Sequence, residues 1–361
     1  MFKKSIIFLI LVFFLLAGCS KVEEVSGVPD LEGELTEDAP DEEEIVDYEA
    51  IKANEAGEIM VIMYHSIGEE EKEFTRTPEN FKSDLQKLYD LGYRPISLED
   101  YAKGNINTEA GLSPVVITFD DGNLNNFNIF EKEDGSFEID PNCAVAILED
   151  FHKEHPDFPL EATFFLNSGI PFKQKEYAQY KLEYILERGM DIGNHTATHV
   201  NFKKTVSSDE IEKEIMGVID SLQEYIPEYT INTLSLPFGS RPKDDSLNAY
   251  IAKGSENQYE NIAIVEVGWD PYKSPYHVDF NPEAIHRVRG SDLQEYVKGT
   301  GLDDWIGRLE AGTRVKFISD GSPDKVVVPE EYQNKIDMNK IGERELITYS
   351  STPDTPDEKI D

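Results

Sequence analysis

Residues 115–122 read Val-Val-Ile-Thr-Phe-Asp-Asp-Gly. The apolar and β-branched run predicts a buried strand that ends at Asp120 and Asp121, and Gly122 predicts a turn directly after it. Neighbouring strand side chains point to opposite faces, but a chain that enters a loop can bring both carboxylates to one site. Paired carboxylates at a buried strand end are costly unless a metal, a proton or a cation stabilises them. A solvated Asp-Asp-Gly turn is the alternative.

A second polar motif lies further along the chain. Residues 195–199 read His-Thr-Ala-Thr-His and follow a short apolar strand pattern and Gly193-Asn194. We expect a helical turn that places the two imidazoles on one face, about 6 Å apart between Cβ atoms. Parallel strands would bring this motif and the Asp pair to the same sheet edge. Two His and one carboxylate suit a catalytic Zn²⁺ with an open position, although two surface histidines are the simpler alternative.

Strand and helix patterns alternate through most of the chain. The predicted strands cover residues 59–65, 93–96, 115–122, 162–166, 190–195, 233–236 and 262–267, with helices between them over residues 78–91, 98–102, 144–151, 180–188, 209–225 and 246–253. About seven such units predict a parallel α/β fold, either a closed barrel or an incomplete one. Beyond residue 290 we expect a helix over 293–309 and a hairpin of 313–318 with 325–328, which form a small C-terminal extension.

The N-terminus has the pattern of an export signal. A basic start precedes the apolar residues 5–16, and Leu16-Ala17-Gly18-Cys19 resembles the bacterial lipobox. The resemblance implies cleavage before Cys19 and a lipid on that residue, which would hold the protein at the outer face of the membrane. An ordinary signal peptide or a short uncleaved anchor remains the alternative. Residues 1–18 are therefore assigned to a lipoprotein signal peptide and residues 19–57 to an acidic disordered tether.

Composition limits the partners. The net charge of −38 disfavours nucleic acid and anionic lipid head groups, and it is compatible with neutral or cationic substrates. Apart from Cys19 the only cysteine is Cys143, so we expect no intramolecular disulfide.

The two polar motifs together resemble a known family. Residues 118–122 and 195–199, with the preceding Gly193-Asn194, are similar to the first two motifs of the polysaccharide deacetylases of the NodB-homology, carbohydrate-esterase type. The resemblance covers about residues 58–290 and implies a distorted (β/α)7 barrel. It implies that Asp120 is the general base. It also implies that Asp121, His195 and His199 bind a divalent metal, usually Zn²⁺.

The third family motif is incomplete in this chain. Pro237 and Phe238 match it, and by the resemblance the Phe238 backbone N–H would stabilise the oxyanion. The Arg that normally precedes this pair and orients the base is missing. Arg241, Arg287 and Arg289 are the candidates to replace it, and the sequence does not choose among them.

The remaining motifs match loosely. Trp269 is a candidate wall of the sugar site, with core packing as the alternative. His286 is the candidate general acid. His65 ends the first predicted strand, so it is a candidate site-lining residue. Its Tyr-His pair is similar to one found at this place in a subset of deacetylases that act on extracellular poly-N-acetylglucosamine. A structural histidine is the alternative.

These observations predict a metal-dependent hydrolase that acts on carbon–nitrogen bonds other than peptide bonds. It would remove N-acetyl groups from a cell-envelope or extracellular polysaccharide while anchored through Cys19; a monomer is assumed. The catalytic domain would span residues 58–290, and residues 291–361 would form the extension and tail. Two alternatives stay open: an O-acetyl esterase of the xylan type that uses the same site, and a carbohydrate-binding lipoprotein with little turnover, which the missing Arg suggests.

Overall fold

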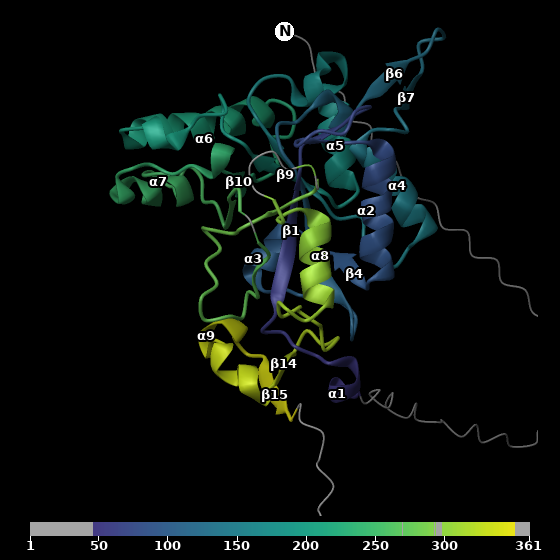
Figure 1. The fold of residues 1–361 in the computed structure, drawn as a ribbon. Helices are drawn as coiled ribbons and strands as arrows, with labels where there is room; N and C mark the ends of the chain where they lie inside the picture. Colours follow the sequence, from purple (N-terminus) through teal and green to yellow (C-terminus); the bar gives the residue numbers. More distant parts are fainter. Residues whose placement is uncertain (1–45, 269, 292, 294–297, 351–361) are drawn as a thin grey trace, which may run out of the picture. The chain divides into compact units, whose positions relative to one another are not determined.

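The computed structural model describes residues 46–350, except residues 269, 292 and 294–297 (Figure 1). The predicted signal peptide, the lipidation site Cys19, the sugar-site candidate Trp269 and the tail from residue 351 lie outside the described residues. Within the part that is described, none of the helices has both the length and the apolar character needed to cross a membrane.

A curled parallel sheet forms the centre of the fold. Its main strands follow the order β11-β10-β9-β8-β5-β1, and every neighbouring pair in this series is parallel. The strands are β1 (Glu58–Tyr64), β5 (Ser113–Phe119), β8 (Thr163–Leu166), β9 (Asp191–Asn194), β10 (Thr233–Ser235) and β11 (Ala263–Val265). The short strands β4 (Tyr93–Pro95) and β12 (Tyr272–Lys273) pair with β5 and β1.

One segment brings the two edges of this sheet together. Strand β13 (Val288–Arg289) pairs in parallel with β1, while Ile285, just before it, forms a parallel bridge with Val265 of β11. The sheet therefore curls into a barrel that residues 285–289 close. This confirms the predicted α/β barrel class.

The helices lie outside this sheet, as the alternating pattern predicts (Figure 1). They are α2 (Pro78–Asp90), α3 (Leu98–Lys103), α4 (Ala144–Glu154), α5 (Ala178–Glu187), α6 (Ser208–Gln223), α7 (Asn248–Ala252) and α8 (Leu302–Glu310). The start of α2 follows from its sequence. The Thr77 hydroxyl accepts a hydrogen bond from the Asn80 N–H, and Pro78 occupies the first turn, where its missing N–H costs nothing.

Strand alternation divides the core into two apolar clusters. Val61, Val116 and Ile285 come from barrel strands and belong to the cluster on one face of the sheet. Ile62 and Val288 belong to the other cluster, which includes buried residues of the surrounding helices. The first cluster therefore lies inside the barrel and the second beneath the helices. This alternation determines which side chains can reach the interior of the barrel.

Two regions differ from the sequence prediction. Segment 313–318 does not form a hairpin with residues 325–328, because its backbone instead bridges the start of the fold at Asn54 and Glu58. Strand β14 (Lys325–Pro329) pairs in parallel with β15 (Glu345–Tyr349), and α9 (Met338–Ile341) lies between them in sequence. The second difference lies at the N-terminal side, where folded structure begins before the predicted tether boundary at residue 57.

The last part of the predicted tether is folded. Helix α1 (Tyr48–Ile51) is capped by Asp47, and Ala53 and Glu55 are buried. The Glu55 carboxylate accepts a hydrogen bond from the Val327 N–H, which ties this segment to β14. The folded unit therefore begins near residue 47 rather than residue 58.

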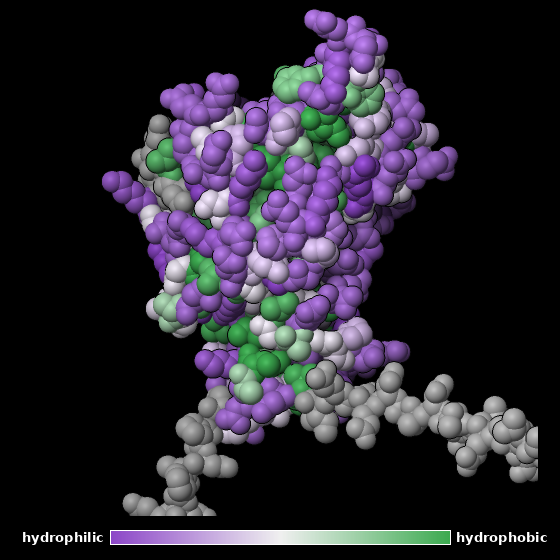
Figure 2. Space-filling model, turned by 90° about the vertical axis from the view of Figure 1, so that its right-hand side faces the viewer, coloured by the Kyte–Doolittle hydropathy of each residue, from purple (hydrophilic) through white to green (hydrophobic). Residues whose placement is uncertain are grey.

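Two small ladders lie where β1 and β5 end. Strand β2 (Ser66–Ile67) pairs with β3 (Thr75–Arg76), and β6 (Ile129–Glu131) pairs with β7 (Phe137–Ile139) in a hairpin. The face of the molecule drawn in Figure 2 is mostly hydrophilic, with smaller hydrophobic areas between the polar side chains.

Candidate active site

The two carboxylates of the strand β5 motif line one pocket of about 620 Å³. Asp120 is buried directly after the strand, and Asp121 follows with a φ of +74°. Positive φ is uncommon for a residue other than Gly, and it reverses the direction in which the next side chain leaves the backbone. The turn therefore directs both side chains to the same pocket instead of to opposite faces of the sheet.

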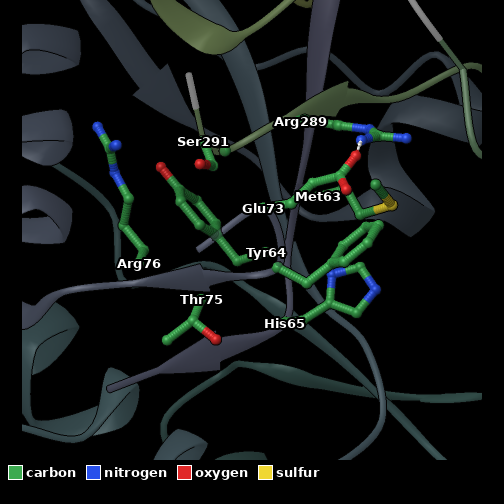
Figure 3. Close-up of a pocket in the computed structure, with 10 residues that line it drawn as sticks. Met63, Tyr64, His65, Glu73, Thr75, Arg76, Arg289 and Ser291 are labelled. Carbon is green, nitrogen blue, oxygen red and sulfur yellow. Dashed lines mark hydrogen bonds and ion pairs between the residues drawn. The ribbon is translucent and has the colours of Figure 1, made fainter. Parts of the chain in front are cut away.

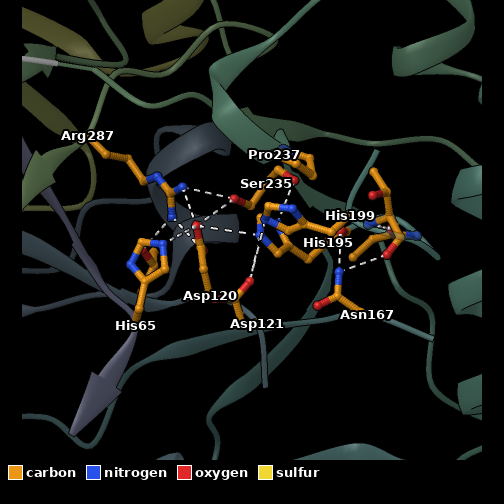
Figure 4. A network of polar contacts seen from close by, with 12 residues as sticks. His65, Asp120, Asp121, Asn167, His195, His199, Ser235, Pro237 and Arg287 are labelled. Carbon is orange, nitrogen blue, oxygen red and sulfur yellow. Dashed lines mark hydrogen bonds and ion pairs between the residues drawn. The ribbon is translucent and has the colours of Figure 1, made fainter. Parts of the chain in front are cut away.

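The two histidines reach the pocket from a loop, so the predicted helical turn is wrong. Thr196 and His199 have φ values of +60° and +56°, and residues 195–199 are not helical. One local and two long-range hydrogen bonds impose this shape. The Asn194 side chain accepts from the Thr196 N–H, and the Asn167 amide donates to the carbonyls of His195 and Thr196 (Figure 4). Strained backbone held by its surroundings is typical of functional sites.

Asp121, His195 and His199 form a candidate metal site. Asp121 Oδ1 lies 3.4 Å from His195 Nε2 and 3.6 Å from His199 Nε2, and the ligand atoms all lie within 4.8 Å of one another. His195 Nδ1 contacts the Ser235 carbonyl at 2.9 Å, which fixes the proton on Nδ1 and leaves the Nε2 lone pair free. That Nε2 is buried and makes no hydrogen bond within the described structure. These donors fit a divalent cation such as Zn²⁺.

Of the three candidate arginines, Arg287 pairs with Asp120. Its guanidinium donates to both oxygens of Asp120, at 2.8 and 2.7 Å, and both side chains are buried (Figure 4). Ser235 completes the group: its hydroxyl accepts from Arg287 at 2.9 Å and donates to Asp120 at 3.1 Å. Two parallel charge-assisted hydrogen bonds hold the carboxylate in one orientation.

Charge around Asp120 sets its protonation. Burial alone would raise the pKa of the Asp120 carboxyl, but Arg287, followed by His195, holds that pKa well below its ordinary value. Asp120 is therefore a carboxylate at neutral pH.

The other two candidate arginines are paired elsewhere: Arg241 with Glu266, and Arg289 with Glu73 (Figure 3).

His65 and Phe238 also line the pocket. His65 Nε2 lies 4.0 Å from Asp120 Oδ2, on the side of the Asp pair away from His199 (Figure 4). Pro237 begins the turn after β10, and Phe238 adopts a φ of +60° with its ring 4.7 Å from the His199 ring. The sequence-predicted residues of the first three motifs are thus brought together, and the oxyanion role of Phe238 stays a prediction.

Comparison with known proteins places this site in a family. Residues 108–256, which include both aspartates, both histidines and the Pro-Phe pair, match the family model described as Polysaccharide deacetylase. The chain carries a polysaccharide deacetylase domain. This domain match indicates a deacetylase, which is a hydrolase. No curated protein matches the chain.

Several solved structures are similar to this deacetylase. The deacetylase PplD of Streptococcus pyogenes, in complex with acetate, aligns with 65% of this chain and 92% of its own, at 20% identity and a TM-score of 0.49. The putative polysaccharide deacetylase BA0330 of Bacillus anthracis aligns with 67% of each chain, at 20% identity and a TM-score of 0.48. IcaB of Ammonifex degensii aligns with 66% of this chain and 93% of its own, at 15% identity and a TM-score of 0.47.

The structure does not bring His286 to the pocket of this deacetylase. Its neighbours Ile285 and Arg287 point into the barrel, so strand alternation turns His286 to the opposite face. There its Nδ1 lies 2.9 Å from Asp270 Oδ1, and its ring lies 5.0 Å from the Tyr272 ring. Side chains of neighbouring residues alternate in extended backbone, so His286 and Arg287 are not expected to face Asp120 together. The geometry therefore does not support the predicted general acid.

We expect His286→Gln to keep most of the deacetylase activity. We also expect it to lower stability more at pH 5.5 than at pH 8.5. The hydrogen bond to Asp270 raises the pKa of His286, so the stabilising interaction is fully present below the unfolded-state pKa of about 6.5 and is lost as pH rises through the folded-state value. Urea denaturation at the two pH values measures the difference. A variant without activity at unchanged stability would restore His286 as the acid.

Proposed function

We propose that this protein is a metal-dependent hydrolase that removes N-acetyl groups from a cell-envelope or extracellular polysaccharide. The observation that carries the proposal is the buried, unbonded Nε2 of His195, which faces Asp121 and His199 beside the ionised Asp120. Three candidate ligands next to an ionised carboxylate are the parts that a hydrolytic site of this kind requires. The family match supports the deacetylase class.

A divalent cation on the three ligands would polarise an acetyl carbonyl and lower the pKa of an adjacent water molecule. Asp120 would accept the proton of the attacking water, because it remains ionised and Arg287 fixes its orientation. Asp120 Oδ2 lies 3.9 Å from His195 Nε2, so base and candidate ligands face the same volume. The Phe238 backbone N–H would donate to the oxygen that gains negative charge.

The departing amine needs a proton, since an amide nitrogen leaves poorly as an anion. His65 is the proposed donor in place of His286. It lines the pocket, and its Nε2 lies 4.0 Å from Oδ2 of Asp120, the residue that would take the proton from water. Burial lowers the pKa of His65, which makes its protonated form the stronger acid. The reaction adds water across the C–N bond, and acetate and a free amine leave.

An O-acetyl esterase is the second candidate, because the same residues would serve it. An alcohol leaves more easily than an amine, so an esterase depends less on an acid such as His65. The hypothesis of a carbohydrate-binding lipoprotein without turnover rested on the missing Arg of the third motif. Because Arg287 pairs with Asp120, that argument no longer supports it.

Acetate release tests the proposal. The full chain would be assayed with N-acetylglucosamine oligomers, peptidoglycan and acetyl-xylan, beside Asp120→Asn. We expect acetate from the N-acetyl substrates only, and loss of this release in the variant. Release from acetyl-xylan alone would favour the esterase, and a protein that binds metal but releases no acetate would contradict both enzymatic functions.

We further propose that the protein is anchored through a lipid on Cys19, at the outer face of the cell membrane. The lipobox-like sequence before Cys19 supports this proposal. We expect Cys19→Ala to release the protein from the membrane fraction and to abolish incorporation of radiolabelled fatty acid. A variant that stays in the membrane and keeps the label would contradict the anchor.

A further inference from the structure

Two large aromatic side chains of the pocket are unusually exposed. Phe74 is 45% exposed and Phe238 is 60% exposed, and both line the 620 Å³ pocket. Exposed aromatic rings beside convergent polar groups are a common feature of ligand sites, where flat apolar faces contact the ligand. Phe238 belongs to a motif recognised in the sequence, whereas Phe74 comes from the loop between β2 and β3.

The two rings lie at opposite ends of a row of reactive groups. The Phe74 ring packs 4.8 Å from the His65 ring, and His65 lies beside Asp120. On the other side, His199 lies beside Asp121, and the centre of its ring lies 4.7 Å from the centre of the Phe238 ring. Figure 4 shows His65 and His199 on either side of the Asp pair. The centre of the pocket is therefore flanked by one exposed ring on each side.

Phe74 is held in place before any ligand arrives. Its carbonyl accepts a hydrogen bond from the Ser66 N–H at 3.1 Å, directly after His65. The Arg289 guanidinium lies 5.2 Å from the centre of the Phe74 ring, and the neighbouring Glu73 pairs with Arg289 beside His65 (Figure 3). Arg289 belongs to the barrel strand β13, so the ring is fixed to the barrel rather than carried on a free loop tip. A preorganised ring loses little entropy on binding.

We propose that Phe74 and Phe238 are sugar-binding platforms on either side of the reaction centre, so that the protein acts on internal residues of a glycan chain. This inference rests on the proposed function and specifies its substrate. A pyranose ring has an apolar C–H face that packs on an aromatic ring, while its hydroxyls point to solvent. With one sugar on each ring, the N-acetyl group of the residue between them reaches the Asp pair.

Chain-length kinetics test the inference. The full chain, Phe74→Ala and Phe74→Trp would be compared on β-1,4-linked N-acetylglucosamine from monomer to hexamer. We expect the wild-type kcat/KM to rise with length. We expect Phe74→Ala to raise KM about tenfold for the hexamer and much less for the monomer, and Phe74→Trp to restore KM for the hexamer. Phe130→Ala is the matched control, because Phe130 is 46% exposed on β6 and does not line this pocket.

Three outcomes would overturn the inference without affecting the proposed function: wild-type turnover independent of length, equal losses of Phe74→Ala on monomer and hexamer, or an equal effect of Phe130→Ala. Absence of acetate from every substrate would instead contradict the proposed function. In that event, calorimetric titration of the hexamer into the wild-type and Phe74→Ala proteins decides the inference. Weaker binding to the variant supports the platform, and equal binding overturns it.

Discussion

Asp120→Asn is expected to lower kcat for acetate release by about 10²- to 10⁴-fold, the usual contribution of a positioned general base. Asn occupies nearly the same volume and keeps an oxygen acceptor for Arg287, but it cannot accept the proton of the attacking water. Divalent metal binding should persist, because Asp121, His195 and His199 are unchanged. Acetate release and metal content are measured on the same preparations.

The variant also needs a stability control, because Asp120→Asn leaves the buried Arg287 without a counter-charge. Thermal unfolding shows whether the inactive protein is folded at the assay temperature. Asp209→Asn, at an exposed position in the first turn of α6, controls for the substitution itself. Folded, metal-bound Asp120→Asn with wild-type kcat would show that Asp120 is not the base.

Arg287→Leu is expected to destabilise the protein by about 3–5 kcal/mol at pH 7, the usual cost of removing one partner of a buried ion pair. Arg287 is fully buried, and its Nη2 lies 2.7 Å from Asp120 Oδ2. In the variant the Asp120 carboxylate would remain buried without its main counter-charge. Its pKa should therefore rise, and the acid limb of the kcat/KM profile should move to higher pH.

The sign of the pH effect on stability follows from the same pair. The folded-state pKa of Asp120 lies below its unfolded value, so the pair stabilises the fold above the unfolded pKa of about 3.9, and this contribution is lost as pH falls through the folded value. The stability gap between wild type and Arg287→Leu should thus be larger at pH 7 than at pH 3. Urea unfolding measures both gaps, with the less buried Arg241→Leu as the control. A gap that does not shrink in acid would mean that Arg287 acts through packing and not through Asp120.

Local sequence signals predicted the elements that carry the site. The apolar run into Asp120 predicted β5, and the hydrophobic periodicity predicted α2 and α6. Adjacent parallel strands then explain why Asp120 and His195 share one edge of the sheet. These features depend on residues close together in the chain, which is why sequence patterns report them.

Features that depend on distant partners were missed or left open. The loop of His195 and His199 takes its shape from Asn167 and from backbone at positive φ, so the i, i+4 spacing wrongly suggested a helix. Arg287 could be chosen among the three candidate arginines only from the pairing of β13 with β1, which brings it to Asp120. Arg287 also lies beyond the segment that the family model matches. The parallel pairing of β14 with β15 likewise joins segments separated by α9, where a local hairpin was expected.

The central claim is that Asp121, His195 and His199 hold one catalytic cation. The most direct test is calorimetric titration of the metal-stripped full chain with Zn²⁺. The structure predicts one site per chain in the wild type, and loss of that site in His195→Ala with the fold retained by circular dichroism. Absence of Zn²⁺ binding to the wild type, or equal binding to His195→Ala, would contradict the account.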